Sequence, residues 1–458
     1  MIKSRPSNRS DGISRRKFVY GVAGSVIAVG VVGATAAYLG SRPTSQATSQ
    51  RTIQPPQPTS IPAPAPGTSS FPVGYYQIYS DPALNFRFNF WYNCYYAGTG
   101  DDSMLSEMKS FAPLIKTYDD WKSQFLKMAE KAMSNGETLK AAYYYRGAEF
   151  IMLPSDPQKQ PTRQQFLQLT RSFYGLDDLR FTVPYTDGNQ SGNLPGYRLT
   201  PANPKGTLVM FGGYDSYIEE LVPQAFVFRD AGYDVVLFEG PGQGGALEDY
   251  GLTMTPEWEK PVAAVLDHFG LDSVSLMGIS LGGYLVIRAA AFEPRVQRAI
   301  ADDVIYSFSG CMWSALSTID ADVLHTLYVG NSVNPLDGMA FNALVERGMQ
   351  GSLYTSWAIN QGMHVFGLKT PFELFRTAEN YSAAGISGQV NQEVLLLAGS
   401  KDLDVPVQMF YSQIAALPNV SSLTARLFTE AEQAQNHCQV GNIGLQLNYI
   451  VDWLDSIE

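Results

Sequence analysis

The sequence predicts an α/β protein whose mostly parallel sheet carries helices on both faces. Short apolar runs typical of buried strands recur after about Tyr197, and amphipathic stretches typical of helices separate them. This alternation is the signature of repeated strand–helix–strand units. The expected strands are residues 207–211, 235–238, 274–277, 393–398 and 423–429, and the expected helices are residues 217–231, 257–269 and 281–292.

Residues 1–39 predict an export signal or an N-terminal anchor. Basic residues end in Arg15-Arg16-Lys17, and an uncharged apolar run diluted by glycine follows from Val19 to Leu39. A twin arginine before such a run is typical of the twin-arginine export route. About 20 apolar residues can also cross a bilayer, so cleavage and anchoring both stay open. We therefore expect a protein that acts outside the cytoplasm, either secreted or tethered to the membrane.

Residues 40–70 predict a linker, because they are rich in Pro, Ser, Thr and Gln and include Pro62-Ala63-Pro64-Ala65-Pro66. Such a segment buries too little apolar surface to fold and behaves as a semi-extended tether. The chain has a net charge of −11, which argues against nucleic acid as a partner. Contact with a membrane is expected only through the N-terminal segment.

Residues 71–195 are expected to form a helical cap domain ahead of the sheet. Aromatic residues crowd residues 86–96, and helical spacing continues over residues 121–133 and 139–153. An aromatic stripe at this spacing usually packs in a core. The alternative is an aromatic wall that accepts a flat or apolar acyl group.

A catalytic domain is expected over residues 196–458, and its strongest motif is Gly278-Ile279-Ser280-Leu281-Gly282. The motif joins the apolar run 274–277 to the helical pattern 281–292, so Ser280 stands on a strand-to-helix turn with its hydroxyl exposed. Small residues are needed on either side because larger ones would collide with the strand or helix. The helix also directs its positive end at the turn, which favours a developing oxyanion. Ser280 is therefore the candidate nucleophile.

Asp402 and His437 follow Ser280 in the chain order serine, acid, histidine, one of the orders in which catalytic triads occur. Asp402 stands just after the strand 393–398, and His437 is the one histidine of four downstream of it. Nucleophile, base and orienting acid would thus arrive from separate strand ends. The alternative for His437 is a solvated or hydrogen-bonded loop residue.

An oxyanion hole is expected at the turn that follows the strand 207–211. A glycine pair there lets the backbone approach a substrate, so the N–H of Gly213 or Tyr214 would act together with the N–H of Leu281. A plain β-turn is the alternative. The turn at residues 239–244 lacks the Gly-Lys-Ser/Thr of a phosphate loop, so no nucleotide site is expected.

About ninety residues without a clear strand separate Asp302 from the strand near Val394, and we expect a helical insertion over about 304–390 that covers the site. The three cysteines, Cys94, Cys311 and Cys438, are too few and too scattered for a disulfide framework or a zinc site. Cys438 adjoins His437 but has no strand-turn-helix context, so we expect it to pack as a small apolar residue. No metal or organic cofactor is implied.

These motifs resemble the α/β-hydrolase superfamily, and more narrowly its branch with 2,6-dihydroxypseudooxynicotine hydrolase and the fermentation-respiration switch protein-like esterases. The matching stretches are residues 212–216, 239–244, 278–283, 399–406 and 437–442, within a resemblance that runs from about Tyr197 to the C-terminus. The resemblance implies an α/β-hydrolase fold with helical cap segments, Ser280 as nucleophile, Asp402 as acid and His437 as base. Phe211 departs from the pattern, since many relatives have histidine there.

The function expected from these residues is an exported serine hydrolase that cleaves an ester or related acyl compound through an acyl-enzyme. The substrate would be a small molecule, with an aromatic or apolar acyl group as the first candidate. A peptidase or a carbon–carbon bond hydrolase could use the same triad, and Glu219 and Glu220 are possible partners for a peptide amine. A non-catalytic binding protein on the same scaffold is the alternative from another class.

Overall fold

The computed structural model describes residues 70–316, 321–332 and 334–456, which belong to one compact unit, Pro55–Glu458. The predictions for the export signal and for the linker up to residue 69 lie outside the described residues. Among the described helices, none combines the length and apolar character needed to cross a bilayer.

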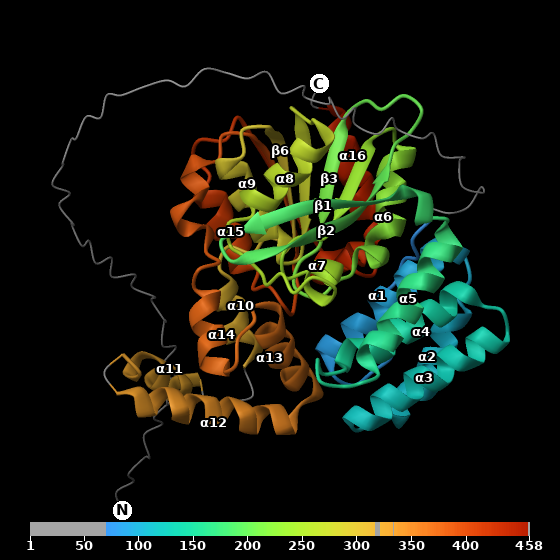
Figure 1. Cartoon of the computed structure of the whole chain (residues 1–458), viewed down its shortest axis with the longest axis vertical. Helices are drawn as coiled ribbons and strands as arrows, with labels where there is room; N and C mark the ends of the chain where they lie inside the picture. The colour runs from blue at the N-terminus through green and yellow to red at the C-terminus, as the bar shows by residue number, and fades with distance from the viewer. Residues whose placement is uncertain (1–69, 317–320, 333, 457–458) are drawn as a thin grey trace, which may run out of the picture. The chain divides into compact units, whose positions relative to one another are not determined.

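Eight strands form a single sheet in the order β1-β2-β4-β3-β5-β6-β7-β8 (Figure 1). Strands β3 to β8 pair in parallel, which confirms the predicted α/β class. The strands are β1 (Arg180–Asp187), β2 (Gln190–Leu199), β3 (Thr207–Phe211), β4 (Asp234–Phe238), β5 (Val274–Ile279), β6 (Val296–Asp302), β7 (Glu393–Gly399) and β8 (Ser422–Phe428).

Strands β1 and β2 form an antiparallel hairpin that joins the sheet at β4. The sheet therefore begins at Arg180, ahead of residue 195, where the boundary between cap and catalytic domain was expected. Gly188 makes the tight turn with a φ of 55°, a conformation that glycine adopts at little cost. Pro184 interrupts the strand pattern, and it is tolerated because β1 is an edge strand.

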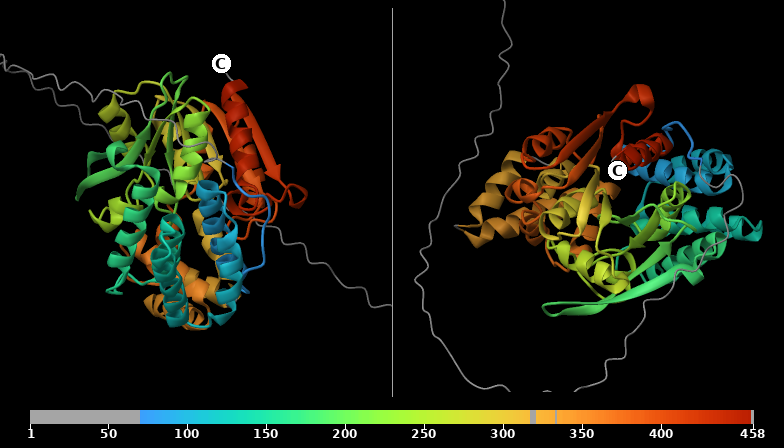
Figure 2. Two further views of the ribbon diagram at one scale, coloured as in Figure 1. Left: turned by 90° about the vertical axis from the view of Figure 1, so that its right-hand side faces the viewer. Right: turned by 90° about the horizontal axis from the view of Figure 1, so that it is seen from above.

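Alternation along the parallel strands builds two apolar layers, because successive side chains point to opposite faces. Leu208 and Met210 of β3 pack in the layer under α6 (Ile218–Asp230) and α16 (Ile443–Ser456). Val209 and Phe211 pack in the layer under α8 (Glu259–Phe269) and α9 (Gly282–Phe292). Helices thus cover both faces, and Figure 2 shows α16 and β8 side by side at one edge of the fold.

In the part of the chain that the structure describes, the α-helices ahead of the sheet are α1 (Pro82–Thr99), α2 (Ser103–Phe111), α3 (Tyr118–Ser134), α4 (Thr138–Ile151) and α5 (Lys159–Tyr174). The side chain of Asp81 caps α1 by accepting from two backbone N–H groups of the first turn, and Gly100 ends the helix in the left-handed conformation. Most of the aromatic stripe is core, since Phe88 and Trp91 pack against Trp121 and are fully buried.

Buried ion pairs join α4 and α5 to α6. Glu220 accepts from the indole N–H of Trp91 at 3.0 Å and from Arg146 at 2.9 Å. Glu219 pairs with Arg171 at 3.0 Å. Both glutamates are almost completely buried, so neither is a surface charge nor a free partner for a peptide amine.

Between β6 and β7 the chain forms the helices α10 (Phe308–Ala315), α11 (Ala321–Gly330), α12 (Pro335–Gly351), α13 (Leu353–Val365) and α14 (Pro371–Ala378). In Figure 1 these helices and the group α1 to α5 both lie below the sheet. The connection from β7 to β8 contains α15 (Gln408–Ala415), and that from β4 to β5 contains α7 (Gly244–Glu248) as well as α8.

Candidate active site

Ser280 lies on the turn between β5 and α9 with a φ of 61°, a strained conformation for a residue other than glycine. Its N–H donates to the carbonyl oxygen of Asp302 at 2.5 Å. Gly278 permits the turn, because a Cβ at this position would lie 2.0 Å from the carbonyl oxygen of Gly282. The structure thus forms the sharp strand-to-helix turn that the motif predicts.

His437 connects Ser280 to an acid. Its Nε2 lies 2.9 Å from Ser280 Oγ, and its Nδ1 lies 2.7 Å from Asp402 Oδ2. The three residues singled out in the sequence, at positions 280, 402 and 437, are therefore brought together from the ends of β5, β7 and β8. This arrangement is that of a serine, a base and an orienting acid.

The loop after β7 holds Asp402 in place. Oδ1 of Asp402 accepts the backbone N–H groups of Asp404 and Val405, each at 2.8 Å, which leaves Oδ2 directed at the imidazole. Asp404 accepts a hydrogen bond from the hydroxyl of Tyr354 at 2.8 Å. Asp402, the acid singled out in the sequence, is thus the residue of this loop that contacts His437.

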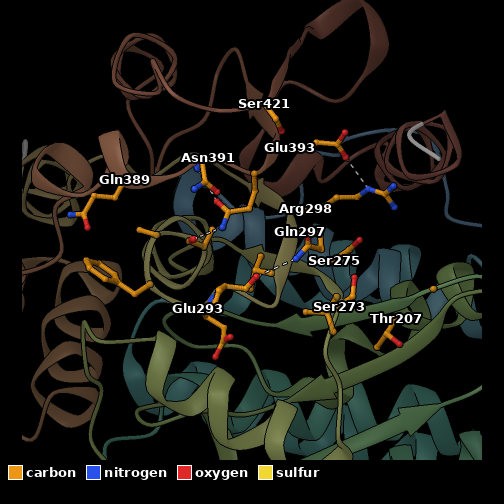
Figure 3. Close-up of a pocket in the computed structure, with 18 of the residues that line it drawn as sticks. Thr207, Ser273, Ser275, Glu293, Gln297, Arg298, Gln389, Asn391, Glu393 and Ser421 are labelled. Carbon is orange, nitrogen blue, oxygen red and sulfur yellow. Dashed lines mark hydrogen bonds and ion pairs between the residues drawn. The ribbon is translucent and has the colours of Figure 1, made fainter.

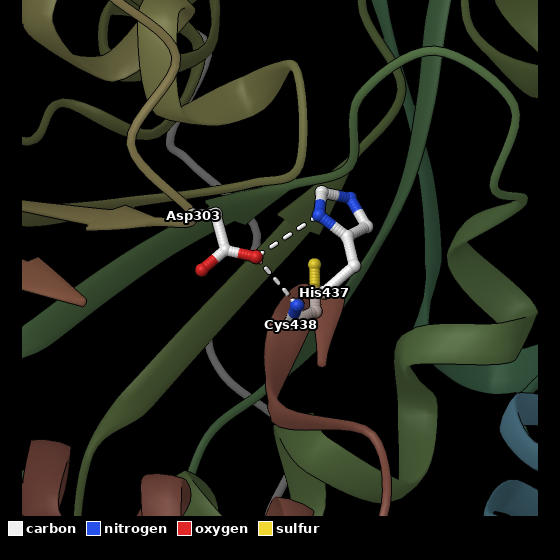
Figure 4. A group of neighbouring side chains, drawn as sticks. All are labelled: Asp303, His437 and Cys438. Atoms are coloured by element: carbon white, nitrogen blue, oxygen red, sulfur yellow. Dashed lines mark hydrogen bonds and ion pairs between the residues drawn. The ribbon is translucent and has the colours of Figure 1, made fainter. Parts of the chain in front are cut away.

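Asp303, which the sequence analysis missed, is a second carboxylate at the same imidazole nitrogen. Its Oδ2 lies 3.0 Å from His437 Nδ1 and accepts the N–H of Cys438 at 2.6 Å (Figure 4). Its Oδ1 accepts from Nε2 of Gln439 at 3.0 Å. The available signal was the pair Asp302-Asp303 at the carboxyl end of β6, beside the strand that carries Ser280.

Asp303, His437 and Cys438 also have potential ligand atoms within 4.8 Å of one another. Burial raises the pKa of the Cys438 thiol to about 12, so the sulfur stays protonated near neutral pH and is a poor metal ligand and nucleophile. Oδ2 of Asp303 already accepts from two N–H groups. The donor set therefore fits a hydrogen-bonded cluster better than a metal site.

Burial and mutual charge shift the pKa values of Asp402, Asp303 and His437. Burial raises the pKa of Asp402 to about 8, and the negative charge of Asp303 adds to this. Burial also opposes ionisation of Asp303, but its hydrogen bond and charge interaction with His437 hold its pKa below the usual value. For His437, burial opposes the charged form, but the charge of Asp402 and the hydrogen bonds to both carboxylates act together and raise the pKa well above its ordinary range. The groups therefore titrate as one coupled unit.

The turn after β3 lies directly against the residue that follows Ser280. A Cβ on Gly213 would lie 2.5 Å from the backbone nitrogen of Leu281, so only glycine allows this approach. Within the described part of the chain, the N–H groups of Tyr214 and Leu281 donate to no backbone carbonyl. Phe211, at the expected departure from the family pattern, packs against Phe238 and Trp258.

The cavity beside Ser280 has an apolar wall and a few charged groups. Its volume is about 70 Å³. The apolar lining includes Ile305, Phe308, Met312, Trp357 and Val405, and the polar lining includes Arg87, Tyr214, Asp215, Tyr354 and Asp404. Arg87 comes from α1, pairs with Asp215, and lies 5.0 Å from the centroid of Phe150 and 5.2 Å from that of Trp357.

One aromatic residue of the stripe reaches the site from α1. The Phe86 ring meets the His437 imidazole edge-on, with ring centroids 5.6 Å apart. This contact excludes water from one side of the base, and neither it nor the place of Arg87 has a local sequence signal.

A second cavity, of about 840 Å³, lies where the parallel strands begin (Figure 3). Thr207, Ser275 and Glu393, at or near the starts of β3, β5 and β7, are among its lining residues. Ser280, Asp402 and His437 instead follow strand ends, where ligands of open α/β sheets bind. The smaller cavity is therefore the candidate active site, although the other is larger.

Similar proteins of known sequence are hydrolases by name, whereas no family model matches the chain. Hydrolase acrC of Aspergillus aculeatus is 29% identical over 301 residues, which span 56% of this chain and 67% of that protein. Alpha/beta hydrolase ucsC of an Acremonium species is 28% identical over 63% of this chain and 65% of its own length. Alpha/beta hydrolase psoB of Aspergillus fumigatus is 26% identical over 77% of this chain and 88% of its own length.

Solved structures show the same fold. The 2,6-dihydroxy-pseudo-oxynicotine hydrolase superposes with a TM-score of 0.50 at 20% identity, covering 76% of this chain and 91% of its own. AbyA5 superposes with a TM-score of 0.54 at 14% identity, covering 78% of this chain and 95% of its own. The resemblance expected from the five motifs is thereby confirmed.

Proposed function

Since the chain belongs to the α/β-hydrolase superfamily, we propose that it is a serine hydrolase with Ser280 as nucleophile. The observation that carries the proposal is the continuous hydrogen-bonded series from Ser280 Oγ through both nitrogens of His437 to Asp402, at 2.9 and 2.7 Å. Each of the three residues follows a different strand of the sheet. Its geometry is that of an activated hydroxyl.

In the proposed reaction, Ser280 Oγ adds to the carbonyl carbon of the substrate while its proton passes to His437 Nε2. The tetrahedral intermediate collapses when Nε2 returns this proton to the leaving oxygen, which gives an alcohol and an acyl-enzyme. Water then attacks the acyl carbon, with His437 again as base, and releases the carboxylic acid and free Ser280.

The N–H groups of Tyr214 and Leu281 are proposed to bind the oxyanion. Both residues line the cavity, whereas Gly213 does not. Gly213 instead supplies the close backbone approach that brings the two donors to the same side of Ser280. Donors of this kind are worth on the order of a hundredfold or more in rate.

The proposed substrate is a small ester or related acyl compound with an aromatic or apolar acyl group. The support is the lining by Phe308, Met312 and Trp357 next to Ser280. A cavity of about 70 Å³ is well below the few hundred Å³ typical of ligand sites, so the covering helices must move for larger substrates. Carbon–carbon bond and peptide hydrolysis stay as alternatives, but the buried pairing of Glu219 and Glu220 removes the expected amine anchor.

We also propose that the protein acts outside the cytoplasm, on the basis of the Arg15-Arg16 pattern alone. Sequencing the N-terminus of the protein recovered from fractionated cells tests this. A mature form that lacks residues 1–39 in the extracytoplasmic fraction is expected for a cleaved signal, and the whole chain in the membrane fraction for an anchor. Retention of the whole chain in the soluble cytoplasm contradicts both.

Covalent labelling tests the nucleophile. We expect a fluorophosphonate to add one adduct to the wild-type protein, detected by intact mass spectrometry, and none to Ser280→Ala. Ser412→Ala, on α15 outside the cavity, is the matched control and should label like the wild type. A folded wild-type protein that stays unlabelled would favour the non-catalytic binding protein. A screen of esters, amides and β-diketones then separates the three hydrolase classes.

A further inference from the structure

We propose that His437 is oriented by a pair of carboxylates, Asp402 and Asp303, which share one proton and act together as its acidic partner. Asp303 is then a positioning residue that acts through His437. This inference rests on the proposed function for its catalytic meaning, but the structural pairing can be measured without any reaction.

Both carboxylates reach the same nitrogen. Nδ1 of His437 lies 2.7 Å from Asp402 Oδ2 and 3.0 Å from Asp303 Oδ2, so one N–H is shared between two acceptors. All three side chains are at most 5% exposed. In a site this dry, water does not screen either carboxylate from the imidazole.

Two neighbouring buried carboxylates do not both stay ionised beside a neutral imidazole, because their repulsion is unscreened. Besides Nδ1 of His437, Asp303 accepts one backbone and one side-chain N–H, from Cys438 and Gln439, and these bonds favour its charged form. The pKa shifts agree, since that of Asp303 is lowered and that of Asp402 is raised to about 8. Near neutral pH, the pair therefore holds one proton and one negative charge, shared between Asp303 and Asp402.

The other titratable groups around the pair are Asp302 on β6, Asp404 after β7, Cys311 on α10 and Cys438. Burial raises the pKa of Asp302 and of both thiols, so these three are uncharged near neutral pH. Asp404 is turned toward the Tyr354 hydroxyl. The charge that His437 faces within hydrogen-bond distance is thus that of the Asp303–Asp402 pair.

The decisive measurement is the pKa of the His437 imidazole, followed by NMR on full-length protein with labelled histidine and assigned with His437→Gln. When the imidazole takes up the shared proton, both carboxylates are ionised around it, so removing one of them takes away negative charge and makes the imidazolium less stable. The midpoint should therefore fall by about one unit or more in Asp303→Asn and in Asp402→Asn, and further in the double variant. An unchanged midpoint in Asp303→Asn, together with a fall in Asp402→Asn, overturns the proposal.

Gln439→Met is a second variant whose expected shift has the opposite sign. It removes the 3.0 Å bond to Asp303 Oδ1 but keeps both carboxylates, so the cluster should bind protons more tightly and the His437 midpoint should rise. A structural disturbance alone gives no reason for opposite shifts. Asp302→Asn is the matched control, because Asp302 is the neighbouring buried carboxyl and its Oδ2 accepts from Gln446 of α16. This variant should shift the His437 midpoint less than Asp303→Asn.

The catalytic consequence is measured by the rate of inactivation with a fluorophosphonate between pH 5 and 9. Complete loss of the acidic partner of the catalytic histidine lowers the rate by on the order of 10⁴-fold. Each single Asn variant should lose less than about a hundredfold, whereas the double variant should show the full loss. A full loss in Asp402→Asn with no further loss in the double variant overturns the shared role. If the wild type does not react, the proposed function fails and the NMR titration still decides the pairing.

Discussion

The Trp357 ring is stacked on the Phe150 ring, with centroids 4.4 Å apart and planes inclined by 23°. Phe150 belongs to α4, ahead of the sheet, and Trp357 belongs to α13 in the insertion between β6 and β7. One aromatic pair thus connects the two helical groups beside the cavity that contains Ser280. Arg87 packs its guanidinium against both rings and strengthens the contact.

Trp357→Ala should open the cavity and widen the range of substrates. Because the ring both lines the cavity and joins the two helical groups, its loss adds volume beside Ser280. The ratio of kcat/KM for p-nitrophenyl octanoate to that for p-nitrophenyl acetate should rise about tenfold or more. Trp313→Ala is the control, since Trp313 lies in the same insertion but packs against Phe375. A ratio that stays at the wild-type value in Trp357→Ala would contradict a covering role for this ring.

Arg146→Met should destabilise the fold strongly. Arg146 is buried and binds Glu149, Glu220 and the carbonyl oxygen of Asp215, so its removal leaves carboxylates without their cation. The free energy of unfolding should fall by about 3–5 kcal/mol in urea titrations.

Arg376→Met provides the comparison for this prediction. Arg376 pairs with Glu379 at 3.2 Å on the surface, and the free energy of unfolding should change by at most about 1 kcal/mol. Adding Glu220→Gln to Arg146→Met should restore part of the lost stability, because it removes a buried charge. Equal losses in the buried and exposed arginine variants would show that the buried network is not what holds α4 to α6.

Gly283→Ala should destabilise the protein and slow the nucleophile. A Cβ at Gly283 would lie 1.7 Å from the carbonyl oxygen of Asp303, so α9 and the turn after β6 would have to separate. Overpacking of this kind costs about 1–3 kcal/mol, which a shift of the urea midpoint measures. Gly388→Ala is the control, since nothing lies within 4 Å of the added atom. Similar midpoints for both variants would show that the turn gives way freely.

Glu239 makes stability depend on pH. Burial, with a contribution from Glu219, raises the pKa of Glu239 to about 8 in the folded chain, whereas an unfolded glutamate titrates near 4.3. The folded state therefore binds this proton more tightly, and the stability it contributes is lost as pH rises from about 4.5 through 8. Melting temperature should fall across this window in the wild type and fall less steeply in Glu239→Gln.

Glu430→Gln, a substitution at an exposed residue, should leave the slope of melting temperature against pH as in the wild type. Asp402 titrates in the same pH window. The difference between the slopes of the wild type and Glu239→Gln therefore isolates the contribution of Glu239 to the pH dependence of stability. A slope that is the same in all three proteins would mean that Glu239 ionises normally.

The parallel sheet and the relation among Ser280, Asp402 and His437 could be predicted because their signals are local. Buried strands show as apolar runs, and the turn at Ser280 shows as small residues at fixed spacing. Chain order alone then singled out His437 from four histidines.

Asp303 and Arg87 could not be predicted because their partners are distant in sequence. The N–H of Cys438 reaches Asp303 across 135 residues, and Arg87 meets Trp357 only after two separate helical groups pack together. The β1–β2 hairpin was not predicted, because Pro184 interrupts the strand pattern of β1. The turn at Gly188 was the available sequence signal for this hairpin. Local patterns thus located the reacting groups, and tertiary contacts supplied the groups that surround them.

The edge-on contact between Phe86 and His437 brings together residues 351 positions apart, from near the two ends of the described chain. During synthesis, this contact and the approach of His437 to Ser280 can form only once residue 437 has left the ribosomal exit tunnel. Reactivity toward serine-directed reagents would then arise only after the polypeptide has emerged as far as His437. In a cell extract, the labelled fraction would count completely assembled molecules and ignore partial translation products.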